Sequence, residues 1–168
     1  LVAGSFTQFN GTAVGRLVRL NPDGSRDSSF TASPGATNSI IYNMVLQSDG
    51  SIFLVGSFTS FNGTAANRIV KILPNGAVDT SFVTGSGASG LIEKIALQSD
   101  GKIIIGGGFE EFNGSTVGKI ARLNADGTLD ASFITGVGFD DNVSAIGVQA
   151  DGKIILGGSF TTFNGTAA

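Results

Sequence analysis

Short apolar runs alternate with turn-forming residues along the whole chain. In residues 92–109 (IEKIALQSDGKIIIGGGF), two apolar runs flank an Asp-Gly dipeptide. This arrangement is the strongest short-range signal for a β-hairpin. Residues 103–105 are apolar without alternation, which indicates a strand buried on both faces. The same hairpin is predicted at residues 43–58 and 143–160.

A third strand is predicted after each hairpin, at residues 15–21, 67–73 and 118–124 (GRLVRLN, NRIVKIL and GKIARLN). A fourth, short strand is expected to carry the pattern Asp-x-Ser-Phe and to lead into a Gly/Ser-rich link such as TGSGASG at residues 84–90. No segment shows the 3.6-residue periodicity of a helix over a sufficient length.

These elements recur with a fixed period. The tripeptide Phe-Asn-Gly begins at four positions separated by 52, 51 and 51 residues: Phe9, Phe61, Phe112 and Phe163. A second Phe precedes each tripeptide by three residues, and Asp-x-Ser-Phe begins at Asp27, Asp79 and Asp130. Eleven of the 13 Phe residues occupy repeated positions, so we interpret Phe as a core residue of each repeat.

Four strands in a repeat of about 51 residues are typical of a β-propeller blade, so we expect an all-β, propeller-like array. The repeats are approximately 1–52, 53–103 and 104–154, and 155–168 start a fourth. Because a ring usually needs four to eight blades, we expect residues 1–168 to be a segment of a longer chain or to associate with other copies. The alternative is a β-trefoil, although its aromatic and length features fit less well: the chain lacks Trp and has 14 surplus residues.

Composition excludes much familiar chemistry. The chain has no His and no Cys, so it offers no imidazole base, thiolate nucleophile or disulfide. A net charge of −3 does not resemble the basic footprint of a nucleic-acid-binding protein. No apolar stretch approaches the roughly 18 residues that a transmembrane helix requires. We therefore expect neither nucleic acid nor a membrane span.

The string LNADGTLDASFITGVGFDDNVSAIGVQADGKIILGGSFTTFNG, residues 123–165, resembles the delta-sixty tandem repeat of bacterial and phage proteins. The resemblance extends over the whole chain, and the first copy departs from it at Arg26, Ser51 and Pro34. It implies a propeller-like fold in surface or virion proteins and brings no catalytic residues with it.

Two kinds of Asn- or Asp-rich turn are candidate sites. Asn10, Asn62, Asn113, Asn164 and Asn142 match the N-glycosylation pattern, but periodic Asn-Gly at a strand junction favours a tight turn with positive φ. The segments Asn21-x-Asp23-Gly24 and Asn124-x-Asp126-Gly127, with Asp27 and Asp130, resemble half of a calcium loop. Neither has the bidentate Glu of an EF-hand, and the middle copy has Leu73 and Asn75, so we favour turns with at most an accessory calcium site.

Charged pairs are the remaining candidates. Basic residues recur three apart, at Arg16 and Arg19, Arg68 and Lys71, and Lys119 and Arg122. In a regular strand this spacing puts them on opposite faces, so we expect one to be solvated and the other to pair with an Asp. A ring of like charge around a central channel is the alternative. The adjacent acids Glu110-Glu111 and Asp140-Asp141 do not recur, and neighbours in a strand point apart, which argues against glycosidase chemistry.

We therefore expect a non-enzymatic structural and binding module of an extracellular, cell-surface or virion protein, with rim loops that recognise carbohydrate or protein, as in adhesion. The sequence identifies no catalytic residue, no cofactor, no metal ligand and no ligand-binding residue. The expected partners are other repeats of the same or a neighbouring chain, and a homo-oligomer or larger assembly. The alternatives are a carboxylate-dependent propeller lyase or glycosidase, acting through Glu110 or Asp140, and a mechanical spacer in a fibre or array.

Overall fold

The computed structural model describes residues 1–36 and 39–168, and within that part it is built of strands and turns without a helix. It accordingly holds no helix that could span a membrane. The chain divides into two compact units, Leu1–Thr80 and Ser81–Ala168, which are described separately. The all-β prediction is confirmed.

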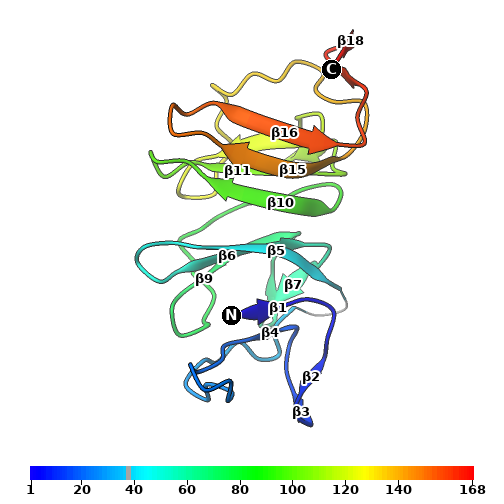
Figure 1. Ribbon diagram of the computed structural model, residues 1–168. Coiled ribbons are helices and arrows are strands. Elements are labelled where there is room, and N and C mark those ends of the chain that lie inside the picture. Colours follow the sequence, from blue (N-terminus) through cyan, green and yellow to red (C-terminus); the bar gives the residue numbers. More distant parts are fainter. Residues whose placement is uncertain (37–38) are drawn as a thin grey trace. The chain divides into compact units, whose positions relative to one another are not determined.

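The first unit contains one three-stranded antiparallel sheet and three two-stranded ladders. The sheet has the order β5 (Ile41–Leu46), β6 (Ile52–Gly56), β9 (Ile69–Ile72) (Figure 1). The ladders are β1 (Val2–Ala3) with β4 (Leu17–Val18), β2 (Gln8–Phe9) with β3 (Thr12–Ala13), and β7 (Ser60–Phe61) with β8 (Thr64–Ala65).

The second unit repeats this pattern. Its three-stranded sheet has the order β10 (Ile92–Leu97), β11 (Ile103–Gly107), β14 (Ile120–Leu123). The hairpin of β15 (Val143–Val148) and β16 (Ile154–Gly158) lies against that sheet, with β15 in contact with β10 and β11 (Figure 1). Two short ladders, β12 (Glu111–Phe112) with β13 (Ser115–Thr116) and β17 (Thr162–Phe163) with β18 (Thr166–Ala167), surround Asn-Gly turns.

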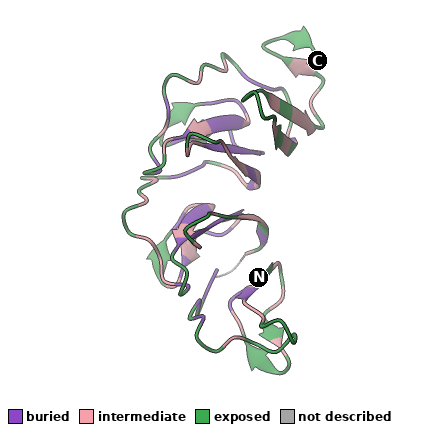
Figure 2. Cartoon of the chain, turned by 60° about the vertical axis from the view of Figure 1, so that its left-hand side comes forward, coloured by how far each residue is buried: buried purple, intermediate pink, exposed green. Residues whose placement is uncertain are grey.

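The predicted hairpins and third strands are confirmed, and the middle strand is the most buried. Every residue of β6 and β11 is buried, as the unbroken apolar runs predict (Figure 2). The equivalent β16 is half-buried, because β16 pairs only with β15 in the described part of the chain. Phe58, Phe61, Phe109 and Phe112 are fully buried, which confirms Phe as a core residue of the repeats.

Each first strand bulges where it passes the Gly that ends the middle strand. The ladders of β5, β10 and β15 shift register between Ile41 and Asn43, Ile92 and Lys94, and Val143 and Ala145. A Cβ placed on Gly107 would lie 2.3 Å from the carbonyl oxygen of Leu91. Only glycine allows the two backbones to approach this closely.

The fourth segment is not a continuous strand. Its place in the sheet is reduced to single bridges, Leu20 with Arg26, Ile72 with Val78, and Leu123 with Leu129. The Asp of Asp-x-Ser-Phe is the physical reason, because Oδ1 of Asp27 accepts hydrogen bonds from both the backbone N–H and the hydroxyl of Ser29. This local bonding turns the backbone away from the extended conformation that a fourth strand would need.

Candidate functional site

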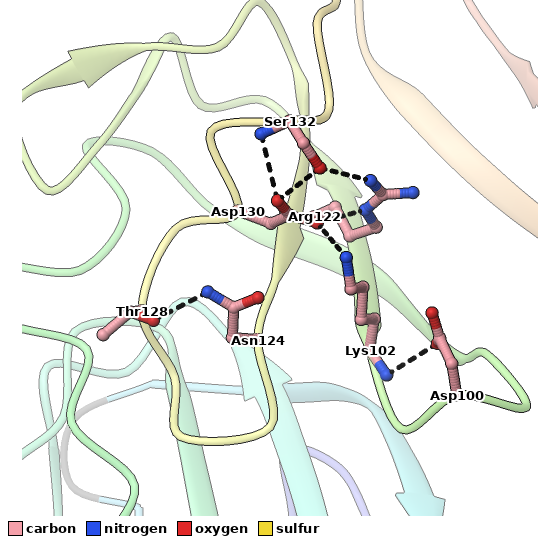
Figure 3. A network of polar contacts seen from close by, with 7 residues as sticks. All are labelled: Asp100, Lys102, Arg122, Asn124, Thr128, Asp130 and Ser132. Atoms are coloured by element: carbon pink, nitrogen blue, oxygen red, sulfur yellow. Dashed lines mark hydrogen bonds and ion pairs between the residues drawn. The ribbon is translucent and has the colours of Figure 1, made fainter.

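In each of the three repeats that contain both segments, a partly buried ion pair links the third strand to the Asp of Asp-x-Ser-Phe. Asp27 pairs with Arg19, Asp79 with Lys71, and Asp130 with Arg122. In the third repeat, Lys102 also reaches Oδ2 of Asp130, at 2.6 Å, so two cations converge on one carboxylate (Figure 3). The expectation that one member of each basic pair binds an Asp is therefore confirmed.

These contacts favour the charged form of the carboxylates. Hydrogen bonds from Ser29, followed by the contact with Arg19, lower the pKa of Asp27 to about 2. Lys102 and Ser132 hold the pKa of Asp130 well below its ordinary value. These aspartates stay ionised and accept hydrogen bonds from neighbouring side chains, so they connect the third strand to the turn that follows it. Carboxylates held in this way are poorly suited to act as general acids or bases near neutral pH.

The first member of each basic pair behaves differently from the prediction. Arg16, Arg68 and Lys119 precede the strand with φ of 65°, 72° and 74°, so the assumption of a regular strand does not hold there. Arg16 donates to the carbonyl of Ala36, and Lys119 pairs with Glu110 although its side chain is only 13% exposed. These cations are held by the protein rather than freely solvated.

The Asp-Gly turns use their carboxylates internally. Oδ1 of Asp23 accepts from the N–H and hydroxyl of Ser25, and Asp126 binds Thr128 in the same way. Among the described residues, no group of three or more carboxylates could hold a metal ion. The favoured interpretation of these segments as turns with an Asp bonded to nearby backbone agrees with this geometry.

The Asn-Gly-Thr/Ser motifs form tight turns in which Asn has positive φ: Asn10, Asn62, Asn113 and Asn164 at 47–56°. In three repeats Oδ1 of this Asn also accepts a backbone N–H from the link before the hairpin, namely from Gly35, Ser86 and Gly138. The sequence pattern predicts the turn. The structure adds the side-chain hydrogen bond between Asn and the link, called the Asn clamp below, which the pattern does not reveal.

The adjacent acids are engaged separately. Glu110 pairs with Lys119, whereas Asp140 accepts hydrogen bonds from the backbone N–H groups of Thr161 and Thr162 and from the Thr161 hydroxyl. These donors lower the pKa of Asp140 to about 2. The structure therefore gives the two sequence-derived catalytic candidates structural partners.

An open cleft of about 510 Å³ lies between two Gln-x-Asp-Gly turns of the second unit. It is lined by residues of the β10–β11 and β15–β16 turns: Leu97, Gln98, Ser99, Asp100, Val148, Gln149, Ala150 and Gly152. The lining combines apolar residues with amide side chains, one hydroxyl (Ser99) and one carboxylate (Asp100). Such a mixture suits a ligand that combines hydroxyl groups with apolar faces.

Gln98 carries an unusual polar atom at this cleft. Its Oε1 is buried and has no hydrogen-bond partner in the described structure. In the first unit the equivalent Gln47 accepts a hydrogen bond from the hydroxyl of Ser51, at 2.7 Å. Residue 102 is Lys instead of Ser, and its side chain extends to Asp130, so Gln98 loses that donor. A buried acceptor without a donor is costly, and a ligand hydroxyl could satisfy it only after the Gln98 side chain turns toward the cleft.

Sequence reasoning did not find this cleft as a ligand site. The Gln-x-Asp-Gly pattern is visible as a hairpin turn, but the pairing of two such turns depends on how consecutive repeats stack. The first copy has Ser51 where the later copies have Lys102 and Lys153, so the sequence does not distinguish Gln98 from Gln149. The consequence of this exchange for Gln98 is visible only with the side-chain contacts.

A family model for a β-propeller domain of unknown function (DUF5122) matches residues 1–30, 47–82, 98–133 and 149–168. The matched segments follow the repeat, and together they cover well over half of the chain. No curated protein and no solved structure matches the chain significantly. The family match decides between the two fold classes in favour of the propeller over the trefoil. The chain belongs to the DUF5122 family of β-propeller domains.

Proposed function

We propose that the chain is a non-enzymatic binding module that presents the cleft between the turns at residues 97–100 and 148–152 to a carbohydrate. The observation that carries this proposal is a cleft of about 510 Å³ lined in part by Gln98, whose buried Oε1 has no donor among the described residues and would become available to a ligand when the side chain turns toward the cleft. The resemblance to delta-sixty repeats supports a place at the surface of a bacterium or on a phage virion.

The chemistry of the lining suits a sugar. A sugar ring offers hydroxyl donors for amide oxygens, and its C–H faces suit small apolar side chains. Gln98 and Gln149 supply amide groups, while Leu97 and Val148 supply apolar surface. Once the Gln98 side chain turns toward the cleft, a sugar hydroxyl that donates to its Oε1 would remove the cost of a buried acceptor without a donor.

The state of the acids supports binding rather than turnover. A glycosidase needs one carboxyl group protonated and a second one positioned across the scissile bond. Asp140 is held ionised by three hydrogen bonds, and Glu110 is bound by Lys119. Both Glu110 and Asp140 therefore make contacts that stabilise the local fold.

The test is a glycan array probed with the 168-residue chain, followed by calorimetry with the sugars that bind. Gln98→Ala is expected to weaken binding about five- to tenfold, the value of one hydrogen bond. Gln47→Ala, in the equivalent turn of the first unit, is the matched control and should leave the affinity unchanged. Equal effects of the two variants would contradict the assignment of the cleft.

Two other results would overturn the proposed function. A complete absence of saturable glycan binding, with binding of a protein ligand or of no ligand, would favour a protein-recognition module or a mechanical spacer. Glycan cleavage that is abolished by Glu110→Gln or Asp140→Asn would make the chain an enzyme.

A further inference from the structure

The chain contains five Asn-Gly dipeptides, which begin at Asn10, Asn62, Asn75, Asn113 and Asn164. This dipeptide is chemically reactive, because the backbone nitrogen of Gly can attack the side-chain amide carbon of Asn and Gly has no side chain to hinder the approach. The attack needs an amide that is free to turn and a Gly nitrogen that is accessible. Hydrogen bonds that hold the amide in another orientation therefore slow the reaction.

The dipeptide at Asn75 lies in a packed turn. Its Oδ1 accepts a hydrogen bond from the N–H of Ala77 at 3.0 Å, and the N–H of Gly76, the attacking group, donates to the carbonyl of Leu73 at 2.9 Å. A Cβ on Gly76 would lie 2.8 Å from the backbone nitrogen of Ala32. Both reacting groups of this dipeptide are therefore held by their surroundings.

The other four dipeptides form the two-residue loops of the short ladders. In each loop both residues have positive φ, and a Cβ placed on the Gly would meet nothing within 4 Å. The loops thus share one backbone conformation and an equally open Gly. Asn62 and Asn113 are the two whose preceding link and following turn both lie within the chain, so they can be compared directly.

Asn62 is held by two hydrogen bonds. Its Oδ1 accepts the N–H of Gly35 at 2.8 Å, and its Nδ2 donates to the carbonyl of Gly76 at 3.1 Å. The second bond holds the nitrogen that would leave as ammonia and fixes the plane of the amide. Asn62 is also half-buried. Both bonds must break before the amide carbon can face the nitrogen of Gly63.

Asn113 is held on one side only. Its Oδ1 accepts hydrogen bonds from the N–H of Ser86 at 2.7 Å and from the hydroxyl of Ser86 at 3.3 Å. Its Nδ2 makes no hydrogen bond among the described residues, although the carbonyl of Gly127, the equivalent of Gly76, belongs to the same unit. Asn113 is exposed. Its amide is therefore freer to turn than that of Asn62.

We propose that Asn113-Gly114 is a site of spontaneous deamidation and isomerisation from which Asn62-Gly63 is protected. The backbone nitrogen of Gly114 loses its proton and bonds to Cγ of Asn113. The Cγ–Nδ2 bond breaks, and ammonia leaves with that proton, which gives a cyclic imide. Water then opens the ring. Opening at the side-chain carbonyl gives aspartate, and opening at the backbone carbonyl gives isoaspartate.

The two products affect the Asn clamp differently. Aspartate keeps a side-chain oxygen at the position of Oδ1, so it still accepts the N–H of Ser86. Isoaspartate adds a methylene to the backbone of a two-residue loop, so the loop no longer matches the ladder of β12 with β13 and the clamp is lost. Isomerisation at residue 113 thus detaches the turn from its link.

Peptide mapping by mass spectrometry of the folded 168-residue chain, after incubation at mildly alkaline pH, tests the proposal. The ten Lys and Arg residues place the five dipeptides in different tryptic peptides, so each rate is measured separately. Asn113 should react roughly two- to tenfold faster than Asn62, the range expected for one additional hydrogen bond. In urea the two rates should converge, because both residues lie in Phe-Asn-Gly.

Ser86→Ala tests the contact that holds Asn113. It removes the hydroxyl that reaches Oδ1, so it should raise the rate at Asn113 about twofold, the value of a weak hydrogen bond. The rate at Asn62 in the same variant is the internal control and should stay unchanged.

Three results would overturn the proposal. The first is a rate at Asn62 that equals or exceeds the rate at Asn113 in the folded chain. The second is a difference between the two sites that persists in urea, because it would then arise from the local sequence. The third is a folded chain that does not react at Asn113 while the unfolded chain does.

Discussion

Oδ1 of Asn113 accepts a hydrogen bond from the backbone N–H of Ser86, 2.7 Å away and 27 residues earlier in the chain. Asn62 binds the N–H of Gly35, and Asn164 that of Gly138, in the same way. One amide side chain therefore ties each of these Asn-Gly turns to the link that precedes the hairpin before it. The positive φ of the Asn places its side chain for this contact.

Asn113→Ala should destabilise the chain by about 1–3 kcal/mol, because it leaves a backbone N–H without its acceptor and puts Ala at a left-handed φ. Asn10→Ala is the matched control, since Asn10 has a similar φ of 47° but its side chain has no hydrogen-bond partner in the described structure. Urea unfolding measures both. Equal losses would show that the turn conformation alone matters and that the clamp adds nothing.

Gly107→Ala should be among the most destabilising single substitutions, at roughly 3 kcal/mol or more, because its Cβ would overlap the carbonyl oxygen of Leu91. Gly147→Ala, also within a strand, is the control, since its Cβ would meet no atom closer than 3.9 Å. The control should be neutral or slightly stabilising. Thermal unfolding of the two variants distinguishes them, and similar melting temperatures would contradict the close backbone approach at the bulge.

Acid should destabilise the chain through its hydrogen-bonded aspartates. Asp27 and Asp140 have a pKa of about 2 in the folded chain and an ordinary value near 3.8 when unfolded. The unfolded chain therefore binds more protons between these values, so the stability from the two groups is present above about pH 4 and is lost as the pH falls toward 2.

Melting temperatures measured from pH 6 to about pH 2 check this dependence. The double variant Asp27→Asn and Asp140→Asn should be less stable than the parent chain at pH 6 and should lose less on acidification. A variant that keeps the full acid dependence would assign it to other carboxylates, such as Asp130.

Much of the fold follows from sequence pattern alone. The Asp-Gly dipeptide between apolar runs places the β10–β11 hairpin, and the unbroken run at residues 103–105 predicts the complete burial of β11. Local signals of this kind are strong because turn chemistry and side-chain period act within a few residues. The repeat then transfers each assignment to its equivalents.

Two features could not be predicted in the same way. The side chain of Asp27 competes with the strand ladder for the N–H of Ser29, so an apolar pattern overestimates the fourth strand. Oε1 of Gln98 lacks a donor because the Lys102 side chain binds Asp130 instead of Gln98. Lys102 and Asp130 lie 28 positions apart in the sequence. Such choices among competing partners are settled by tertiary packing, which a single sequence does not encode locally.

Amide hydrogen exchange of the 168-residue chain at low protein concentration tests the central claim, a repeat array in which the middle strand of a complete repeat is buried and paired on both sides. Every amide of β11 should be strongly protected, because β10 and β14 flank it on both sides. In the same 168-residue chain about half of the β16 amides should exchange quickly, because β16 pairs only with β15 among the described residues and alternate N–H groups point to its other edge. Uniform protection across β16, or rapid exchange throughout β11, would contradict the account.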